Sequence, residues 1–146
     1  MNKPFNYSEV PFDFDKCAAE DCTKASTCLR HIALQHTPDS VAFVRMINPG
    51  HLKNMKGACK YYRPDTKIRY ATGFMHTVEA LPLGVADTFR NRMIAYLGRK
   101  NYYRKHRGET RLTPSEQKHI VNLAKELGVV LDEYFDGYID AFNWKV

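Results

Sequence analysis

The second half of the chain has apolar residues at helical spacing. In residues 85–98, four apolar side chains fall at positions i, i+4, i+7 and i+8: Phe89, Met93, Tyr96 and Leu97. This spacing is typical of one face of an amphipathic helix. Gly98 follows directly, and glycine commonly ends helices because it adopts positive φ without a steric penalty. The pattern therefore predicts a helix that ends at Gly98.

Residues 112–128 carry the clearest helix signals. Thr113 can cap the helix, Pro114 suits its first position, and Glu116 completes a capping box. The buried stripe is expected to contain four residues, Ile120, Leu123, Ala124 and Leu127, before Gly128 ends the helix.

The tail, residues 131–142, repeats the helical spacing with a strongly acidic opposite face. Its apolar residues are Leu131, Tyr134, Phe135, Tyr138, Ile139 and Phe142, and its acids are Asp132, Glu133, Asp136 and Asp140. Gly137 inside this segment costs a helix about 1 kcal/mol relative to Ala. We expect a further helix here, held by packing.

The first half of the chain has weaker and more mixed signals. Residues 1–16 contain Pro4 and Pro11, which disfavour a helix, so an irregular arm is expected. A short helix is predicted over 26–36, with Ser26 as a candidate N-cap. Residues 41–47 have strand composition, and residues 67–74 are a second strand candidate.

These elements predict an α+β, mostly helical fold. A single domain over residues 1–146 is expected from the length. Within it, residues 1–66 form a Cys-rich segment and residues 82–146 a helical segment. The N-terminal half is expected to be irregular and to contain a small sheet. A metal site is expected to staple the irregular half.

The four cysteines all lie in the first 59 residues, at Cys17, Cys22, Cys28 and Cys59. Four thiolates satisfy tetrahedral zinc, and they also satisfy a 4Fe-4S cluster. Zinc is the preferred ion, and the cluster is the alternative. His31 could replace one cysteine as a ligand, and the remaining alternative is that the thiols are inert and buried.

Positive charge is concentrated in one segment. The chain has a net charge of +6, and residues 90–111 contain eight Lys or Arg against one acid, Glu109. Localised positive charge favours a polyanionic partner such as nucleic acid, and DNA is the preferred one. The alternative is an ordinary solvated helix face.

Seven residues of this segment are candidate nucleic-acid ligands. Five cations could neutralise phosphates or contact guanine, and two tyrosines could bond to phosphates or stack on unpaired bases. They are Arg99, Lys100, Tyr102, Tyr103, Arg104, Lys105 and Arg107. The alternative for the two tyrosines is a place in the core.

Motifs for catalysis, export and membrane insertion are absent from the sequence. No G-x-S-x-G, Walker loop or H-E-x-x-H occurs, so catalysis is the less favoured reading. The N-terminal residues have no apolar stretch behind a basic start, and no apolar run reaches membrane-spanning length. We therefore expect a cytoplasmic protein.

Two resemblances add to this picture. Residues 119–139 resemble the repressor-type helix-turn-helix family, with Ile120, Leu123 and Ala124 in the first helix and residues 127–129 in the turn. In that family the second helix enters the major groove, yet here the corresponding helix would be acidic. The segments around the cysteines, 67–73 and 101–109 also resemble a family of small, uncharacterised bacterial proteins from gut anaerobes.

The sequence therefore predicts a small, DNA-binding regulatory protein with a structural Cys-metal site. Two other classes stay open. One is a non-enzymatic module that docks an acidic protein on its basic face. The other is an iron–sulfur redox or sensor protein in which the cysteines form the functional site.

Overall fold

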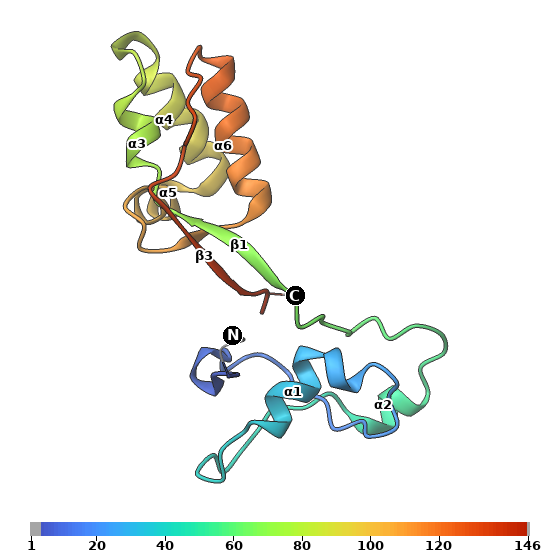
Figure 1. Cartoon of the computed structure of the whole chain (residues 1–146). Coiled ribbons are helices and arrows are strands. Elements are labelled where there is room, and N and C mark those ends of the chain that lie inside the picture. The colour runs from blue at the N-terminus through green and yellow to red at the C-terminus, as the bar shows by residue number, and fades with distance from the viewer. Residues whose placement is uncertain (1–3, 146) are drawn as a thin grey trace. The chain divides into compact units, whose positions relative to one another are not determined.

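A computed structural model describes residues 4–145 of the chain, and its contacts group the chain into two compact units. Unit 1 comprises residues 1–66 and 142–146, and unit 2 comprises residues 67–141. Figure 1 shows the path of the chain through both units. The boundary at residue 66 coincides with the end of the predicted Cys-rich segment. The expectation of a single domain stays a prediction.

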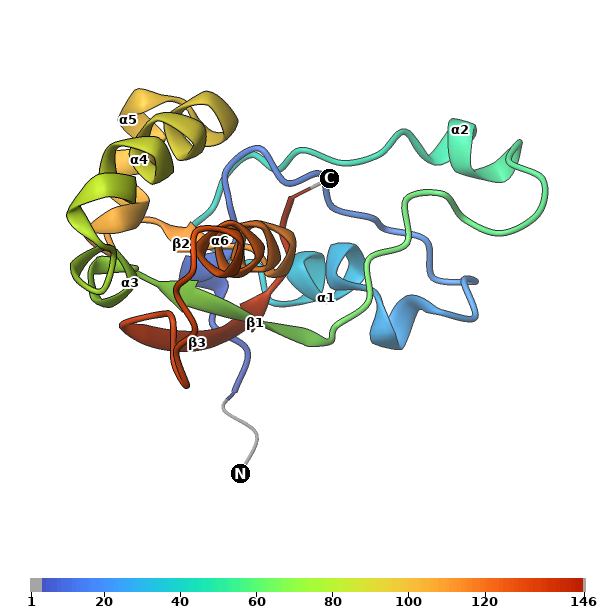
Figure 2. The same ribbon diagram turned by 90° about the horizontal axis from the view of Figure 1, so that it is seen from above.

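Unit 2 contains four helices and the small sheet. The helices are α3 (Met75–Glu79), α4 (Leu83–Leu97), α5 (Arg99–His106) and α6 (Pro114–Glu126). The strands β1 (Lys67–Thr72), β2 (Arg111–Leu112) and β3 (Gly137–Phe142) form a sheet in the order β2-β1-β3. β1 pairs antiparallel with β2, with Ala71 opposite Leu112. Figure 2 shows β1 and β3 side by side below the helices.

Helix α6 confirms the capping prediction. The Thr113 side chain accepts a hydrogen bond from the backbone N–H of Glu116, and the Glu116 carboxylate accepts one from the backbone N–H of Thr113. Ile120, Leu123 and Ala124 are buried in the core of unit 2, and Leu127 packs against that core. Local signals alone therefore located this helix.

The prediction of a helix in the tail is wrong. Residues 137–142 form strand β3, and no helix follows α6 in the part of the chain described up to Lys145. Gly137 packs so closely that an added Cβ would lie 2.8 Å from the Thr72 hydroxyl. Sheet pairing with β1 therefore outweighs the helical spacing of the apolar residues. The described tail does not form the second helix that a helix-turn-helix requires.

Unit 1 has little regular structure. Its helices are α1 (Leu29–Gln35) and α2 (Pro49–Lys53), with short 3-10 turns at Tyr7–Glu9 and Ala25–Thr27. Cys28, not Ser26, is the N-cap residue of α1, so the predicted helix begins later than expected. The predicted strand at 41–47 is wrong, because only an isolated bridge between Lys16 and Met46 forms there.

The core of unit 1 is small. Phe14, Leu29 and Ala33 are buried together, and four further apolar residues pack against them: Phe5, Val10, Phe142 and Trp144. The Trp144 ring meets the Phe14 ring edge-on with centroids 5.0 Å apart. Residues 142 and 144 therefore complete a core that begins near the N-terminus.

The α+β prediction is confirmed, and helices hold more of the chain than strands do. The strand predicted over 67–74 is confirmed as β1, whereas the other two strands of the sheet, β2 and β3, lie in the C-terminal half of the chain. Among the described residues, no helix is both long and apolar enough to cross a lipid bilayer.

Candidate metal site and charged surfaces

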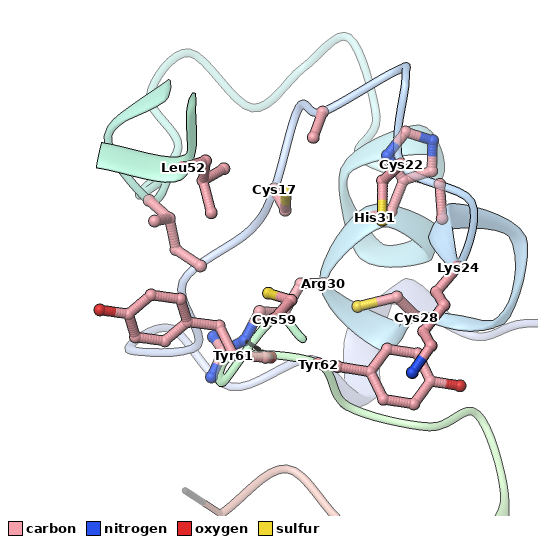
Figure 3. Close-up of a pocket in the computed structure, with 13 residues that line it drawn as sticks. Cys17, Cys22, Lys24, Cys28, Arg30, His31, Leu52, Cys59, Tyr61 and Tyr62 are labelled. Atoms are coloured by element: carbon pink, nitrogen blue, oxygen red, sulfur yellow. Dashed lines mark hydrogen bonds between the residues drawn. The ribbon is translucent and has the colours of Figure 1, made fainter. Parts of the chain in front are cut away.

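All four cysteines line one pocket in unit 1, which encloses about 30 Å³. Figure 3 shows the side chains of Cys17, Cys22, Cys28 and Cys59 around this space. The other residues of the lining are Ala19, Lys24, Ala25, Arg30, His31, Ile47, Leu52, Tyr61 and Tyr62. The predicted ligand set is therefore gathered in one place.

Backbone hydrogen bonds bring the cysteine segments together. The N–H of Cys17 donates to the carbonyl of Arg30 over 3.1 Å, which places Cys17 beside helix α1. The N–H of Leu29 donates to the carbonyl of Arg63 over 2.7 Å, within an antiparallel bridge between Cys28 and Pro64. These bonds connect segments that are distant in the sequence without building a regular sheet.

The thiols share a pocket but are not arranged as a closed coordination sphere. Cys28 is buried, Cys17 and Cys59 are half-buried, and Cys22 is exposed. Within residues 4–145, no three or more His, Cys, Asp or Glu side chains are positioned to hold a metal ion. Tetrahedral zinc would require each sulfur to lie about 2.3 Å from the ion. Binding would therefore draw the side chains inward.

Arg30 places a buried positive charge in the pocket wall. Its side chain is 4% exposed. Nε donates to the carbonyl of Tyr61 and Nη1 to the carbonyl of Asp15, each over 2.7 Å. Both partners are uncharged carbonyls, and the Asp15 carboxylate pairs instead with Arg45 over 2.9 Å. The guanidinium is hydrogen-bonded but has no anion beside it among the described ion pairs.

The electrostatics of Arg30 respond to the cysteines. Burial lowers the pKa of Arg30, and the positive charge of Arg63 lowers it further. Cys28, Asp15 and Cys59 act in the opposite direction on this pKa. Negative charge on the two thiols would therefore stabilise the guanidinium, because opposite charges attract strongly where water is excluded.

His31 also lines the pocket and carries an unusual nitrogen. Its Nδ1 atom is buried and has no hydrogen-bond partner among the described residues. Buried polar atoms are normally satisfied, so an orphaned one calls for a ligand or a bound water. No carboxylate lines this pocket.

The predicted nucleic-acid ligands lie on and beside α5, and two of them are unavailable to a partner. Tyr102 is 3% exposed and belongs to the core of unit 2. Lys105 is 9% exposed, and its ammonium donates to the Arg111 carbonyl over 2.7 Å and to the Glu116 carboxylate over 3.1 Å. The remaining five residues are exposed: Arg99, Lys100, Tyr103, Arg104 and Arg107.

Most of the charge in residues 90–111 is already paired within unit 2. Arg104 and Arg107 both pair with Glu109, over 3.8 Å and 3.0 Å. Three further pairs are Arg90–Asp87, Arg92–Glu126 and Lys105–Glu116. Of the eight cations, Arg99, Lys100 and Arg111 have no ion-pair partner in the described part of the chain. Acids outside the segment thus neutralise much of it, which the local charge count did not reveal.

Sequence reasoning missed two features of the pocket. The first is Arg30, whose place between Cys28 and His31 is a signal for a positive charge beside thiolates. Tyr61 and Tyr62 line the pocket beside Cys59. Their position two and three residues after that cysteine is the signal that the sequence offers.

Comparisons with known proteins give a family but no characterised relative. One family model matches residues 1–144 of the chain. The searches of curated proteins and of solved structures found no match.

Proposed function

The chain belongs to DUF6078, a family of unknown function, and on the geometry of the pocket we propose that it is a metal-binding protein. Cys17, Cys22, Cys28 and Cys59 would hold one ion as thiolates. The observation that carries this proposal is that four cysteines from separate segments line a single pocket whose wall contains a buried guanidinium.

Charge balance supports a thiolate site. A zinc ion bound by four thiolates has a net charge of about −2, because the ligands must be deprotonated. Unit 1 contains two buried cations, Arg30 and Lys16, which are 4% and 5% exposed. Neither has an ion-pair partner among the described residues. Buried charges are costly unless compensated, so an anionic site beside Arg30 would stabilise the unit.

The small core of unit 1 supports a structural role for the metal. Only Phe14, Leu29 and Ala33 form its buried hydrophobic cluster among the described residues. Domains of this size commonly need a disulfide or a metal, because a small core does not offset the entropy of ordering the chain. A metal would tie the segments of α1 and Cys59 together in place of a larger core.

Four cysteine ligands suit a single zinc ion, and they also suit a 4Fe-4S cluster. Zinc is the first candidate, because four thiolates complete its tetrahedral coordination without inorganic sulfide. The iron–sulfur cluster is the alternative.

Metal analysis of anaerobically purified protein tests the proposal. One zinc per chain in a colourless protein supports it, and iron with sulfide in a brown protein supports the cluster. Protein that contains neither, and that binds no added zinc under reducing conditions, contradicts both. Comparing Cys22→Ser with His31→Ala identifies the fourth ligand, and His36→Ala serves as a control because His36 is not part of the pocket lining.

A second candidate function is nucleic-acid binding. What supports it is the net charge of +6 together with exposed cations that lack a carboxylate partner, such as Arg99 and Lys100. Binding to duplex and single-stranded oligonucleotides at rising salt concentration tests it, because phosphate contacts weaken steeply with salt. Failure to bind at low salt, or preferential binding of an acidic protein, would contradict it.

A further inference from the structure

Four cations without an ion-pair partner in the described structure lie in the segment that contains Cys59. Residues 40–64 contain five Lys or Arg and no Asp or Glu. Only Arg45 among these five forms an ion pair in the described structure, with Asp15. Lys53, Lys56 and Lys60 are exposed, and Arg63 is half-buried. By contrast, five of the eight cations in residues 90–111 are paired.

A lysine lies over each of two tyrosine rings that line the pocket. The ammonium of Lys24 lies over the Tyr62 ring at 4.9 Å from its centroid, and that of Lys60 lies over the Tyr61 ring at 5.2 Å. Figure 3 shows Lys24 beside the Tyr62 ring, and the Tyr61 ring on the opposite side, near Leu52. We call this set the tyrosine rim: Lys24, Lys60, Tyr61, Tyr62 and Arg63.

The rim is held in place by its own contacts. The Tyr61 hydroxyl lies 3.0 Å from His51 Nε2, and the Tyr62 hydroxyl lies 2.9 Å from the hydroxyl of Thr27. The carbonyl of Arg63 accepts the 2.7 Å hydrogen bond from Leu29. Both rings are half-buried, so each keeps part of its surface accessible.

We propose that the tyrosine rim binds single-stranded nucleic acid. Its cations would contact phosphates, and its tyrosine rings would stack on unpaired bases. A single strand suits this arrangement better than a duplex, because bases inside a duplex are not free to stack on side chains. The inference rests on the proposed nucleic-acid binding function. It places that binding on the tyrosine rim and not on α5.

The position of the rim links it to the metal site. Lys60 directly follows Cys59, and the bridge between Cys28 and Pro64 borders Arg63. A metal that holds Cys28 and Cys59 would therefore fix the backbone on both sides of the rim. Removing the metal should weaken nucleic-acid binding even though no rim residue is a ligand.

Fluorescence anisotropy with labelled oligothymidylate and oligouridylate tests the inference, with a duplex of equal length for comparison. In the full-length protein, Lys60→Ala/Arg63→Ala should weaken single-strand binding severalfold. It should also reduce the slope of log K against log salt by about 1.4, since each lost phosphate contact contributes roughly 0.7 on a single strand. Arg99→Ala/Lys100→Ala is the matched control, because it removes two exposed, unpaired cations from unit 2.

The outcomes separate the proposals. A larger loss in Arg99→Ala/Lys100→Ala than in the rim variant overturns the inference, and so does tighter binding of the duplex or no binding at low salt. If the double rim variant does not fold, Lys60→Glu replaces it, since Lys60 is exposed. Zinc content is measured on the same samples. Rim-dependent binding by protein that neither contains nor takes up zinc would contradict the metal site alone, and rim-independent binding by zinc-loaded protein would contradict the rim alone.

Discussion

The Arg30 guanidinium donates a 2.7 Å hydrogen bond to the carbonyl of Tyr61. This bond connects helix α1 to the segment that carries Cys59, thirty-one residues away in sequence. A second bond from the same guanidinium reaches the carbonyl of Asp15, and the guanidinium carbon lies 4.7 Å from the centroid of the Phe14 ring. One side chain therefore joins the wall of the cysteine pocket to the small core of unit 1.

Replacing Arg30 should destabilise unit 1. Arg30→Met removes two charge-assisted hydrogen bonds and leaves two part-buried carbonyls without their donors, at a cost of roughly 2–4 kcal/mol. Urea unfolding followed by Trp144 fluorescence measures this, because Trp144 is the single tryptophan and packs on Phe14. The control Arg45→Met breaks an exposed ion pair and should cost less than about 1 kcal/mol. Equal losses would show that Arg30 has no special role.

Removal of the metal should weaken unit 1 more than unit 2. A chelator added to zinc-loaded protein is expected to lower the urea midpoint reported by Trp144, because metal binding stabilises only the folded ligand set. Far-UV circular dichroism reports mainly on the longer helices, α4 and α6, and should change little. Coincident shifts in both signals would argue that the metal stabilises the chain as a whole.

Glu116 has two hydrogen-bond partners, so replacing it should reduce the stability of unit 2 more than replacing the N-cap residue alone. Its carboxylate accepts from the backbone N–H of Thr113 and from the buried ammonium of Lys105. Glu116→Ala should cost roughly 2–4 kcal/mol, because it leaves Lys105 buried without an anion. Thr113→Ala should cost about 1 kcal/mol. Thermal unfolding by circular dichroism compares them, and a larger effect of Thr113→Ala would contradict the assigned role of Lys105.

Two glycines of unit 2 should respond in opposite ways to a methyl group. Gly73 has a φ of +79°, and a Cβ there would lie 2.5 Å from a carboxylate oxygen of Asp136. That carboxylate accepts hydrogen bonds from the N–H groups of Met75 and His76. Gly73→Ala should therefore cost at least about 1–2 kcal/mol.

Gly84 in α4 is the matched control. No atom lies within 4 Å of a Cβ added at this position. Gly84→Ala should stabilise unit 2 by up to about 1 kcal/mol, since alanine loses less entropy in a helix. Chemical unfolding of both variants, followed by circular dichroism, gives the comparison. A loss of stability in Gly84→Ala would contradict the finding that a methyl group fits at this position.

Unit 2 should lose stability as the pH falls below the usual pKa of histidine. Burial lowers the pKa of His106, whose ring stacks on Tyr102 at 5.9 Å between centroids. Asp136 and Glu79 oppose this shift, and Arg107 adds to it. Because the unfolded chain binds the proton more readily, stability falls as the pH drops through about 6.5, the unfolded value.

The variant His106→Gln should show a flatter stability profile between neutral pH and pH 5. Chemical unfolding at several pH values measures the difference. Two outcomes would contradict the assignment to His106. One is a wild-type free energy of unfolding that increases from neutral pH to pH 5, and the other is a pH dependence that His106→Gln leaves unchanged.

Local signals predicted some elements and failed for others. The capping box located α6 because each of its hydrogen bonds joins residues three positions apart. The tail failed because β3 depends on β1, about seventy residues earlier, and no helical pattern records that pairing. Residues 41–47 failed for the converse reason, because strand composition forms a strand only where a partner strand is available.

The candidate site was predictable in composition but not in surroundings. The four cysteines were predicted as one set, and their gathering in a single pocket agrees with that set. The prediction that all five cations on and beside α5 are available to a partner is wrong for Lys105, which pairs with Glu116. A count of the acids within residues 90–111 does not include Glu116. The sequence does not show which cations near Cys59 lack an ion-pair partner, because that depends on where the acids lie in the fold.

The packing of Phe142 and Trp144 against Phe5 and Phe14 has a consequence for biosynthesis. Unit 2 lies between the two stretches that build unit 1, so the ribosome delivers all of residues 67–141 before the aromatic cluster of unit 1 can close. During translation the helices of unit 2 can therefore form before the core of unit 1 is complete. A nascent chain stalled before residue 142 would thus lack Phe142 and Trp144, and the small core of unit 1 would stay incomplete.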